Sequence, residues 1–210
     1  ITRGGKYLGG GLPSGSMPSG LGGGIRCDTS SPVISNNEIV YNSLGDWATP
    51  PLVPGQGGGI GLLGSHPLIL GNTISENETL HFSGEGGGIY CELSMADIFY
   101  NTIYRNHSNY GSAVRCTFSR PMLYNNWIEQ NQHYYVPPVY FGPGESAVSL
   151  PACFDFELDY NYFVSNTGET GGAINVTGAD RGTISNNLFV NNRAYQADLG
   201  TGGDGGAIWV

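Results

Sequence analysis

Three residues, Tyr90, Glu92 and Arg115, are of the types that could act on a sugar. A tyrosine ring can pack against a sugar, and an acid beside a base can transfer protons. If their two segments form neighbouring strands, as the repeat described below predicts, the side chains lie within about 5–7 Å of one another. The alternative is a solvated ion pair between strands, which adds little stability. We favour this structural interpretation and keep the three residues as catalytic candidates.

A second polar group lies in the alternating run of residues 154–160. The alternation directs Asp155, Glu157 and Asp159 to one outer face, about 6.8 Å from one carboxylate to the next. Paired carboxylates at such distances can serve glycoside hydrolysis, and their hard oxygens can bind Ca²⁺.

Two arginines offer a structural reason for Asp155. When the repeats are aligned by their asparagines, Arg120 falls on one side of Asp155 and Arg181 on the other. Such a ladder needs no catalytic role for the carboxylate. It leaves Glu157 and Asp159 as candidates for calcium, and we expect no other cofactor.

Cys91 and Cys116 occupy equivalent positions in neighbouring repeats. A separation of about 4.8 Å would permit a disulfide. Stacked buried thiols are the alternative, and we favour them. A thiol nucleophile would need a nearby base, and the sequence pairs no histidine with a cysteine. The four histidines are His66, His81, His107 and His133.

A repeat positions all of these residues. Small residues followed by a β-branched residue, which we call the anchor, recur seven times. The anchors are Ile25, Ile60, Ile89, Val114, Val148, Ile174 and Ile208. The pattern Asn-x-[Ile/Phe]-x-x-Asn follows the first six anchors. Its first asparagines are Asn37, Asn72, Asn101, Asn126, Asn161 and Asn187, and its closing asparagines are Asn42, Asn77, Asn106, Asn131, Asn166 and Asn192.

The spacing of the repeat predicts a solenoid. From each anchor to the closing asparagine the distance is 17 or 18 residues, whereas from that asparagine to the next anchor it varies from 8 to 18. Stacked coils must match in length, while one corner remains free to carry loops of any length.

Within each repeat the apolar residues alternate with a period of two, which is typical of short strands. Apolar residues lie two positions after each anchor, three before each first asparagine and two after it. We therefore predict an all-β fold, a right-handed parallel β-helix with three short strands per coil and about seven coils. The first-column asparagines then stack at about 4.8 Å, where their amides can bond the backbone and one another. Asparagine also tolerates the left-handed conformation that a corner needs, so we assign these residues a structural role.

The composition excludes several classes. Glycine makes up 35 of 210 residues, without the every-third spacing of collagen. The formal charge is 8 − 17 = −9, which argues against nucleic acid as a partner. No apolar stretch is long enough to span a bilayer.

Three N-x-[S/T] sequons occur, at Asn77, Asn106 and Asn175. Their number alone is no evidence for glycosylation.

Two motifs carry a resemblance. Gly-Gly-Ala-Ile at 171–174 and 205–208, with Phe-Val-Ser-Asn at 163–166 and Phe-Val-Asn-Asn at 189–192, resembles the paired GGA[ILV] and FxxN motifs of chlamydial polymorphic outer-membrane proteins. Those are surface adhesins with a β-helical passenger region. More broadly, residues 22–210 look like the right-handed parallel β-helix superfamily that includes pectate lyases.

The resemblance has two functional implications. Pectate-lyase-like enzymes use a basic residue and calcium-binding acids on the outer face of a strand, where this chain carries Arg26, Asp28, Tyr90, Glu92 and Arg115. The adhesin likeness implies an extracellular or cell-surface protein. In both families the repeated motifs are structural, so the fold transfers more readily than the activity.

We divide the chain into a Gly/Ser/Pro-rich segment, residues 1–21, and the β-helix, residues 22–210. The first is a partial coil or a lead-in, and the second ends within a coil. A β-helix presents unpaired backbone at its ends. We therefore expect either continuation in a longer chain or self-association end to end, which would build a filament.

We predict a structural or adhesive solenoid, extracellular or on the cell surface, and favour a non-enzymatic role. The alternative is a polysaccharide-binding module or a carbohydrate-active lyase or hydrolase. It would use the Tyr90 face or the loops at 43–56, 132–144 and 193–204. Aromatic residues in or beside these loops could bind a polysaccharide or a surface protein: Trp47, Tyr134, Tyr135, Tyr140 and Tyr195.

Overall fold

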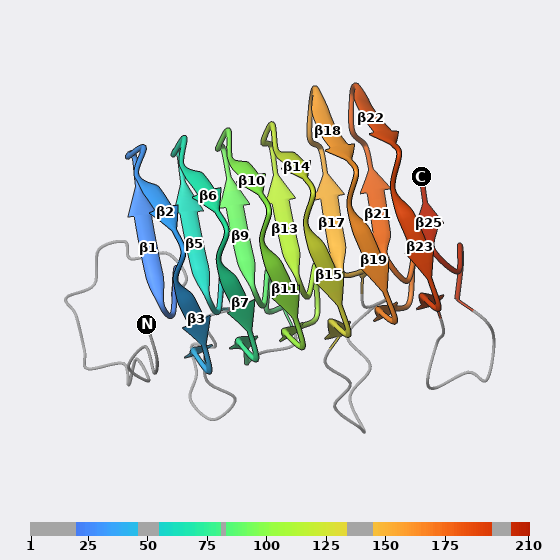
Figure 1. Cartoon of the computed structure of the whole chain (residues 1–210), viewed down its shortest axis with the longest axis horizontal. Coiled ribbons are helices and arrows are strands. Elements are labelled where there is room, and N and C mark those ends of the chain that lie inside the picture. Colours follow the sequence, from blue (N-terminus) through green and yellow to red (C-terminus); the bar gives the residue numbers. More distant parts are fainter. Residues whose placement is uncertain (1–19, 46–54, 81–82, 134–144, 195–202) are drawn as a thin grey trace.

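The structure, a computed structural model, describes residues 20–45, 55–80, 83–133, 145–194 and 203–210. The regular structure in these ranges consists of strands, wound into coils that stack along one axis (Figure 1). Every strand pairs in parallel with its equivalents in the neighbouring coils. The predicted parallel β-helix is therefore confirmed.

The strands form four sheets. The first sheet contains β1 (Ile25–Asp28), β5 (Ile60–Leu63), β9 (Ile89–Glu92), β13 (Val114–Thr117), β17 (Val148–Pro151), β21 (Ile174–Thr177) and β25 (Ile208–Trp209). The second contains β2 (Val33–Ser35), β6 (Leu68–Leu70), β10 (Asp97–Phe99), β14 (Met122–Tyr124), β18 (Phe156–Asp159) and β22 (Gly182–Ser185). The third contains β3 (Glu38–Val40), β7 (Thr73–Ser75), β11 (Thr102–Tyr104), β15 (Trp127–Glu129), β19 (Tyr162–Val164) and β23 (Leu188–Val190).

The fourth sheet goes beyond the three strands per coil that the sequence predicts. It contains β4 (Ser43–Leu44), β8 (Glu78–Thr79), β12 (His107–Ser108), β16 (Gln132–His133), β20 (Thr167–Gly168) and β24 (Arg193–Ala194). Each of these strands has two residues and directly follows a closing asparagine. Two residues are too few to show an alternating pattern, so periodicity could not reveal them.

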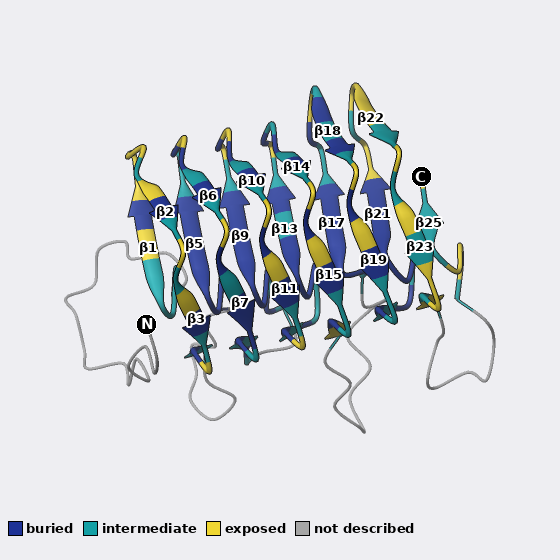
Figure 2. Ribbon diagram, in the orientation of Figure 1, coloured by how far each residue is buried: buried dark blue, intermediate teal, exposed yellow. Residues whose placement is uncertain are grey.

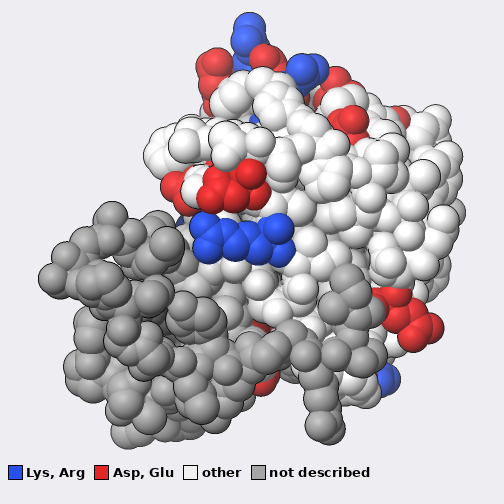
Figure 3. All heavy atoms as spheres, turned by 90° about the vertical axis from the view of Figure 1, so that its left-hand side faces the viewer, with Lys and Arg blue, Asp and Glu red and all other residues white. Residues whose placement is uncertain are grey.

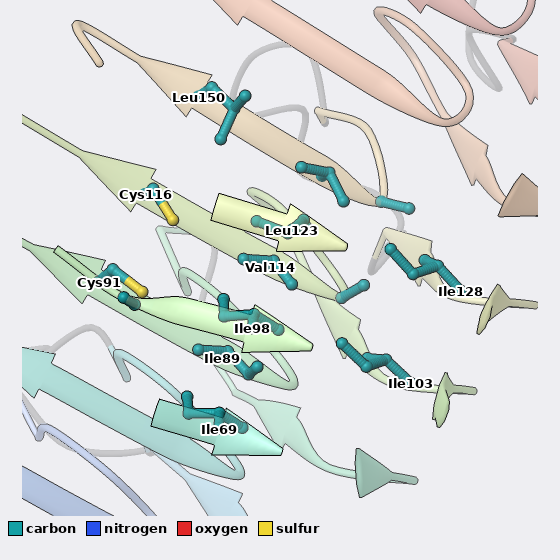
Figure 4. Packing of buried hydrophobic residues seen from close by; sticks show 14 of the residues in the cluster. Ile69, Ile89, Cys91, Ile98, Ile103, Val114, Cys116, Leu123, Ile128 and Leu150 are labelled. Carbon is teal, nitrogen blue, oxygen red and sulfur yellow. The ribbon is translucent and has the colours of Figure 1, made fainter. Parts of the chain in front are cut away.

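The predicted inward rows form one continuous core. In-register pairing stacks like on like, as in the row Ile69, Ile98 and Leu123 (Figure 4). The central strands of the first sheet are buried along most of their length, while outward positions of the third sheet are exposed (Figure 2). At the end of the first row Val210 departs from the prediction, because it is 83% exposed.

The asparagine columns form two hydrogen-bonded ladders, as predicted. At Asn101 the backbone N–H and the side-chain amide both donate to Oδ1 of Asn126, at 2.9 and 3.1 Å. The same amide donates to the carbonyl of Ile69 in the preceding coil at 2.9 Å. The closing column repeats this scheme, for example from Asn77 to Asn106. Each rung satisfies buried polar groups that would otherwise cost free energy.

The left-handed residues are not the ladder asparagines, which corrects that part of the prediction. They directly precede them, as at Tyr100 (φ 56°) before Asn101 and Arg105 (φ 52°) before Asn106. Further left-handed residues lie just after the first strand and three residues before the anchor of that strand. A coil with all of these residues therefore turns at four left-handed corners. At Gly57 (φ 75°) an added Cβ would lie 2.2 Å from a backbone oxygen, so only glycine fits there.

A serine ladder, which the sequence analysis missed, lines the corner after the first strand. The backbone N–H of Ser65 donates to Oγ of Ser94 at 3.1 Å, and that of Ser94 to Oγ of Ser119 at 3.0 Å. Its signal was a serine five residues after each of the first four anchors, a small polar residue at constant spacing.

The predicted N-terminal segment lies mostly outside the described residues, which begin at residue 20. Leu21 already forms a parallel bridge with Gln56. Seen along the solenoid from the β1 side, uncharged side chains dominate the described surface, and acidic and basic groups gather in small clusters (Figure 3).

Candidate functional site

The first sheet places Tyr90 and Arg115 in register on neighbouring strands β9 and β13, as predicted. The Tyr90 hydroxyl donates to Oε2 of Glu92 at 3.2 Å and accepts a hydrogen bond from Nε2 of Gln56 at 2.9 Å. However, Tyr90 is only 2% exposed, so its ring does not stand in solvent. A ring so enclosed offers no platform for a sugar.

Arg115 does not pair with Glu92. Its Nε donates to Oε2 of Glu85 at 2.9 Å, and its Nη1 donates to Oε2 of Glu145 and, at 3.0 Å, to Oγ of Ser149. The guanidinium carbon also lies 5.0 Å from the centroid of the Tyr110 ring. We call Arg115, Glu85, Glu145, Ser149 and Tyr110 the Arg115 cluster.

The elements place the Arg115 cluster across three consecutive coils. Glu85, Tyr110 and Glu145 lie just before β9, β13 and β17, and bridges connect the first two backbones. Ser149 is the register partner of Arg115. The arginine side chain is only 12% exposed, so in place of the expected solvated ion pair there is a mostly buried connection across three coils.

Burial sets the electrostatics of the cluster. Desolvation raises the pKa of Glu85, and the nearby Arg115 opposes this shift only in part. The pKa of Tyr110 is raised by burial and then by the charge of Glu145. Desolvation also raises the pKa of Tyr90, with the charges of Glu85 and Glu92 adding to it. Both tyrosines therefore stay protonated at neutral pH and act as neutral partners.

Sequence reasoning missed Glu85 and Glu145 as partners of Arg115. They lie four and three residues before an anchor, in a column that also contains Gln56, Tyr110, Thr170 and Asp204. This column pairs through isolated bridges rather than through a strand, so it leaves no alternating pattern. The offset of four residues from the anchor, which holds throughout this column except at Glu145, was a signal that could have found it.

The calcium candidates lie on the outer face of β18, each with its own partners. Glu157 accepts a hydrogen bond from the Tyr124 hydroxyl, which raises the pKa of Tyr124 to about 12. Asp159 accepts from Oγ of Ser185 and Nδ2 of Asn186, both at 2.8 Å. Within the described ranges, no three or more His, Cys, Asp or Glu side chains gather closely enough to hold a metal ion.

The predicted ladder of Arg120, Asp155 and Arg181 forms only between Asp155 and Arg181. Nε of Arg181 lies 3.0 Å from Oδ1 of Asp155. Arg120 instead contributes its charge to Asp97, whose pKa is raised by burial and lowered by that arginine. Asp155 has a left-handed backbone (φ 46°) in a coil with an extra residue, and this local turn was not visible in the alignment.

All four cysteines are free and buried. Cys91 and Cys116 are register partners, stacked in the core row that Leu150 continues (Figure 4). Sγ of Cys153 lies 3.1 Å from the carbonyl oxygen of Cys116. Burial raises the pKa of Cys116 well above its ordinary value and that of Cys153 to about 12. Cys116 and Cys153 are therefore packing groups and not nucleophiles.

One histidine has an acidic neighbour that sequence reasoning missed. Nε2 of His133 lies 3.4 Å from Oε1 of Glu169, and both side chains are buried. His107 is half-buried, and desolvation lowers its pKa. The loop aromatic residues Trp47, Tyr134, Tyr135, Tyr140 and Tyr195 lie outside the described residues.

Comparisons with known proteins support the architecture. A family model described as a right handed beta helix region matches residues 17–208, which takes in all but the last two of the described residues. No curated protein and no solved structure matches the chain. Among the described residues, no helix is long and apolar enough to cross a membrane.

Proposed function

Because the chain belongs to the right-handed β-helix family, we propose that it is a structural and adhesive β-solenoid, working outside the cell or on its surface and without catalytic activity. The observation that carries this proposal is the state of Arg115. Its guanidinium is engaged by two carboxylates and a serine, and it connects three coils. An arginine held in this way supports the stack rather than a reaction.

The alternative, a polysaccharide-binding module or carbohydrate-active enzyme acting at the Tyr90 face, makes a different demand. It needs the ring and the guanidinium to be open to substrate, whereas Tyr90 is 2% exposed. Glu92 contributes to this face as the acceptor of the Tyr90 hydroxyl.

The two functions respond differently to Arg115→Ala. If the arginine is structural, the variant loses stability, because the partly buried Glu85 and Glu145 lose their counter-charge. Breaking a fully buried pair costs roughly 3–5 kcal/mol, and the cost is smaller here because both carboxylates are partly exposed. No turnover of acidic or neutral polysaccharides is expected from either protein. Urea unfolding and a reducing-end sugar assay measure the two properties.

Arg26→Ala is the matched control. Arg26 occupies the same column at β1 and pairs with Asp28 in its own strand, with 43% of its side chain exposed, so its loss should leave stability nearly unchanged. Turnover of an acidic polysaccharide by the wild type, lost in a folded Arg115→Ala variant, would establish the enzyme instead.

Surface location and end-to-end stacking belong to the same proposal. The likeness to adhesin repeats supports the location, and protease treatment of intact source cells tests it. Stacking is supported by the in-register pairing of all four sheets, which another copy could continue. Electron microscopy should then show filaments with an axial repeat of roughly 30–35 Å, from about 4.8 Å per coil. A monodisperse monomer at high concentration would contradict the stacking.

A further inference from the structure

Aromatic side chains gather on one flank of the solenoid, on the outer faces of β10, β11, β14, β15 and β19 and at the corners after β10 and β18. We call these residues the aromatic flank: Phe99, Tyr100, Tyr104, Tyr124, Trp127, Tyr160 and Tyr162. Four of them are widely open to solvent, with exposed fractions of 64% for Tyr100, 41% for Trp127, 54% for Tyr160 and 44% for Tyr162.

The fold does not require these rings. Tyr100 and Tyr160 occupy left-handed corner positions (φ 56° and 54°), where the equivalent residues of other coils are asparagine or glycine. Bulky residues are unfavourable in that conformation. The positions of Trp127 and Tyr162 hold glutamate or threonine in the first three coils. A smaller residue would serve the fold at these positions, so the rings are available for a role outside folding.

The flank is also acidic. Asp97 and Glu129 lie on strands that carry rings, and Glu157 and Asp159 lie on β18 just before Tyr160. Two arginines oppose these four carboxylates, Arg105 and Arg120, and the second acts on Asp97. Nε1 of Trp127 donates to Oε2 of Glu129 at 2.8 Å, and the Tyr124 hydroxyl donates to Glu157. Rings and carboxylates are therefore interleaved, which favours a cationic ligand.

The rings can accept a guanidinium. The Arg105 guanidinium carbon lies 6.0 Å from the centroid of the neighbouring Tyr104 ring, within the range of a cation–π contact. Contacts between rings fix their orientation, since Trp127 and Tyr162 stack at 5.3 Å and Phe99 meets Tyr124 edge-on at 5.4 Å. A preorganised surface loses little side-chain entropy on binding.

We propose that the aromatic flank binds an extended, proline-rich and arginine-containing segment of a partner protein. This inference rests on the adhesive role proposed above and names the partner's chemistry. Proline-rich segments in the polyproline II conformation dock on aromatic surfaces at low entropic cost, and neighbouring carboxylates select for arginine.

The spacing fits this ligand. Tyr100 and Tyr160 occupy the same column two coils apart, with the exposed Asn125 between them. Two coil steps amount to about 9.6 Å. A polyproline II helix repeats every three residues and rises about 9.3 Å per turn, so arginines at every third position face one side at nearly this interval.

A polysaccharide fits the flank less well. Trp127 and Tyr162 turn their faces toward each other, with an interplanar angle of 20°, and so present mainly their edges to solvent. Stacking of a sugar on this pair would need ring faces that the pair covers, whereas the proposed guanidinium contacts use Tyr100 and Tyr160. The carboxylates of the flank would also repel an acidic polysaccharide.

The test uses a fluorescein-labelled peptide of Arg-Pro-Pro repeats, followed by fluorescence anisotropy. The wild-type chain should bind it, and the double variant Tyr100→Asn/Tyr160→Asn should bind at least about tenfold more weakly, because both cation–π contacts are lost. Asparagine occupies the same column at Asn125 and keeps the protein charge unchanged, so folding is preserved. Glu157→Gln should weaken binding and reduce its dependence on salt.

Tyr41→Asn is the matched control, since Tyr41 is an exposed left-handed corner tyrosine (φ 57°) off the flank, and it should bind like the wild type. A peptide of Ser-Pro-Pro repeats should not bind. Unchanged affinity in the Tyr100/Tyr160 double variant, or binding of neutral oligosaccharides in place of the peptide, would overturn the proposal. Attachment to cell surfaces without peptide binding would remove this partner but leave the adhesive role.

Discussion

At Arg115, one guanidinium joins side chains that come from three consecutive coils. It holds Glu85 through Nε and both Glu145 and Ser149 through Nη1. Each contact crosses from one coil to another, so the residue acts as a lateral tie on the outside of the first sheet. The cluster holds more carboxylates than cations, which makes its stability depend on pH.

The pH dependence should reside in Glu85. Burial raises its pKa above the ordinary 4.5, so the folded state binds this proton more tightly than the unfolded state. Stability from this group is therefore gained as the pH falls and lost as the pH rises through the raised pKa. We expect the unfolding free energy of the wild type, relative to Glu85→Gln, to increase between neutral pH and pH 4.5.

Urea unfolding of both proteins at a series of pH values measures this difference. Glutamine keeps the size of the side chain and cannot ionise, so it removes only the titration. A difference that is flat with pH, or that falls on acidification, would contradict the assignment of the raised pKa to Glu85.

Residues at periodic positions were predictable from sequence, and residues at corners were not. The inward rows and both asparagine ladders follow from a two-residue period and a fixed repeat length. The true partners of Arg115, by contrast, depend on the direction in which Glu85 and Glu145 leave a corner. Such a direction is set by backbone angles and by the neighbouring coil, so the sequence predicted Glu92 instead.

The corners are the elements that give the coil its shape. Each coil turns at left-handed residues, and the corner after the first strand holds residues as different as Gly64, Leu93, Phe118 and Gly178. The backbone conformation is therefore conserved along the stack, whereas the side chain is free. A bulky residue pays a conformational cost there that glycine does not.

Phe118→Gly should therefore stabilise the protein. Phe118 has φ 49° and is 55% exposed, so glycine relieves backbone strain while losing little packing. We expect a gain of up to about 1 kcal/mol in the unfolding free energy, the balance of strain relief against the entropy of glycine.

The control is Thr102→Gly, at an exposed outward position of β11, where the backbone is extended and glycine is unfavourable. It should lower the unfolding free energy in the same urea titration. Two changes of the same sign would contradict the role given to the left-handed corner.

The fourth strand illustrates what an element needs to be predictable. β8 and β12 consist of two residues each, and they form because the preceding asparagine ladder holds their backbones in register. They have no pattern of their own that could be recognised. The longer strands could be predicted from the alternation of apolar and polar residues, whereas these short strands depend on their neighbours.

On the scale of the whole molecule, the solenoid is a stack in which each coil pairs only with the next. Stability in such a stack is nearly a sum of contributions from coils and their interfaces. A coil should therefore be removable, provided that the register is preserved.

Deletion of residues 34–68 joins Val33 to Ile69, which is the register partner of Ile34. We expect a folded, less stable solenoid with the strand signal in circular dichroism and cooperative unfolding retained. Deletion of residues 34–69 removes one residue more and turns Leu70, an outward residue, toward the core. That protein should fail to fold, and equal behaviour of the two deletions would contradict the stacking rule.

The overall architecture was easier to predict than the contacts of single residues, because seven repeats independently show the same pattern of anchors and apolar positions. The aromatic flank was not foreseen, since its rings come from two sheets and three coils. They share a surface only once the corner angles are known. The positions of Tyr100 and Tyr160 looked like variable corner residues in the sequence.

The asparagine ladders also favour an order of folding, from the N-terminal coil to the C-terminal coil. In each rung the N–H groups of one asparagine donate to the side-chain oxygen of the asparagine in the following coil, as from Asn72 to Asn101 and from Asn101 to Asn126. A finished coil therefore displays unused donors toward the part of the chain that a ribosome synthesises next. Each new coil brings the matching acceptors, so the protein can order itself from its N-terminal side, one coil serving as the template for its successor.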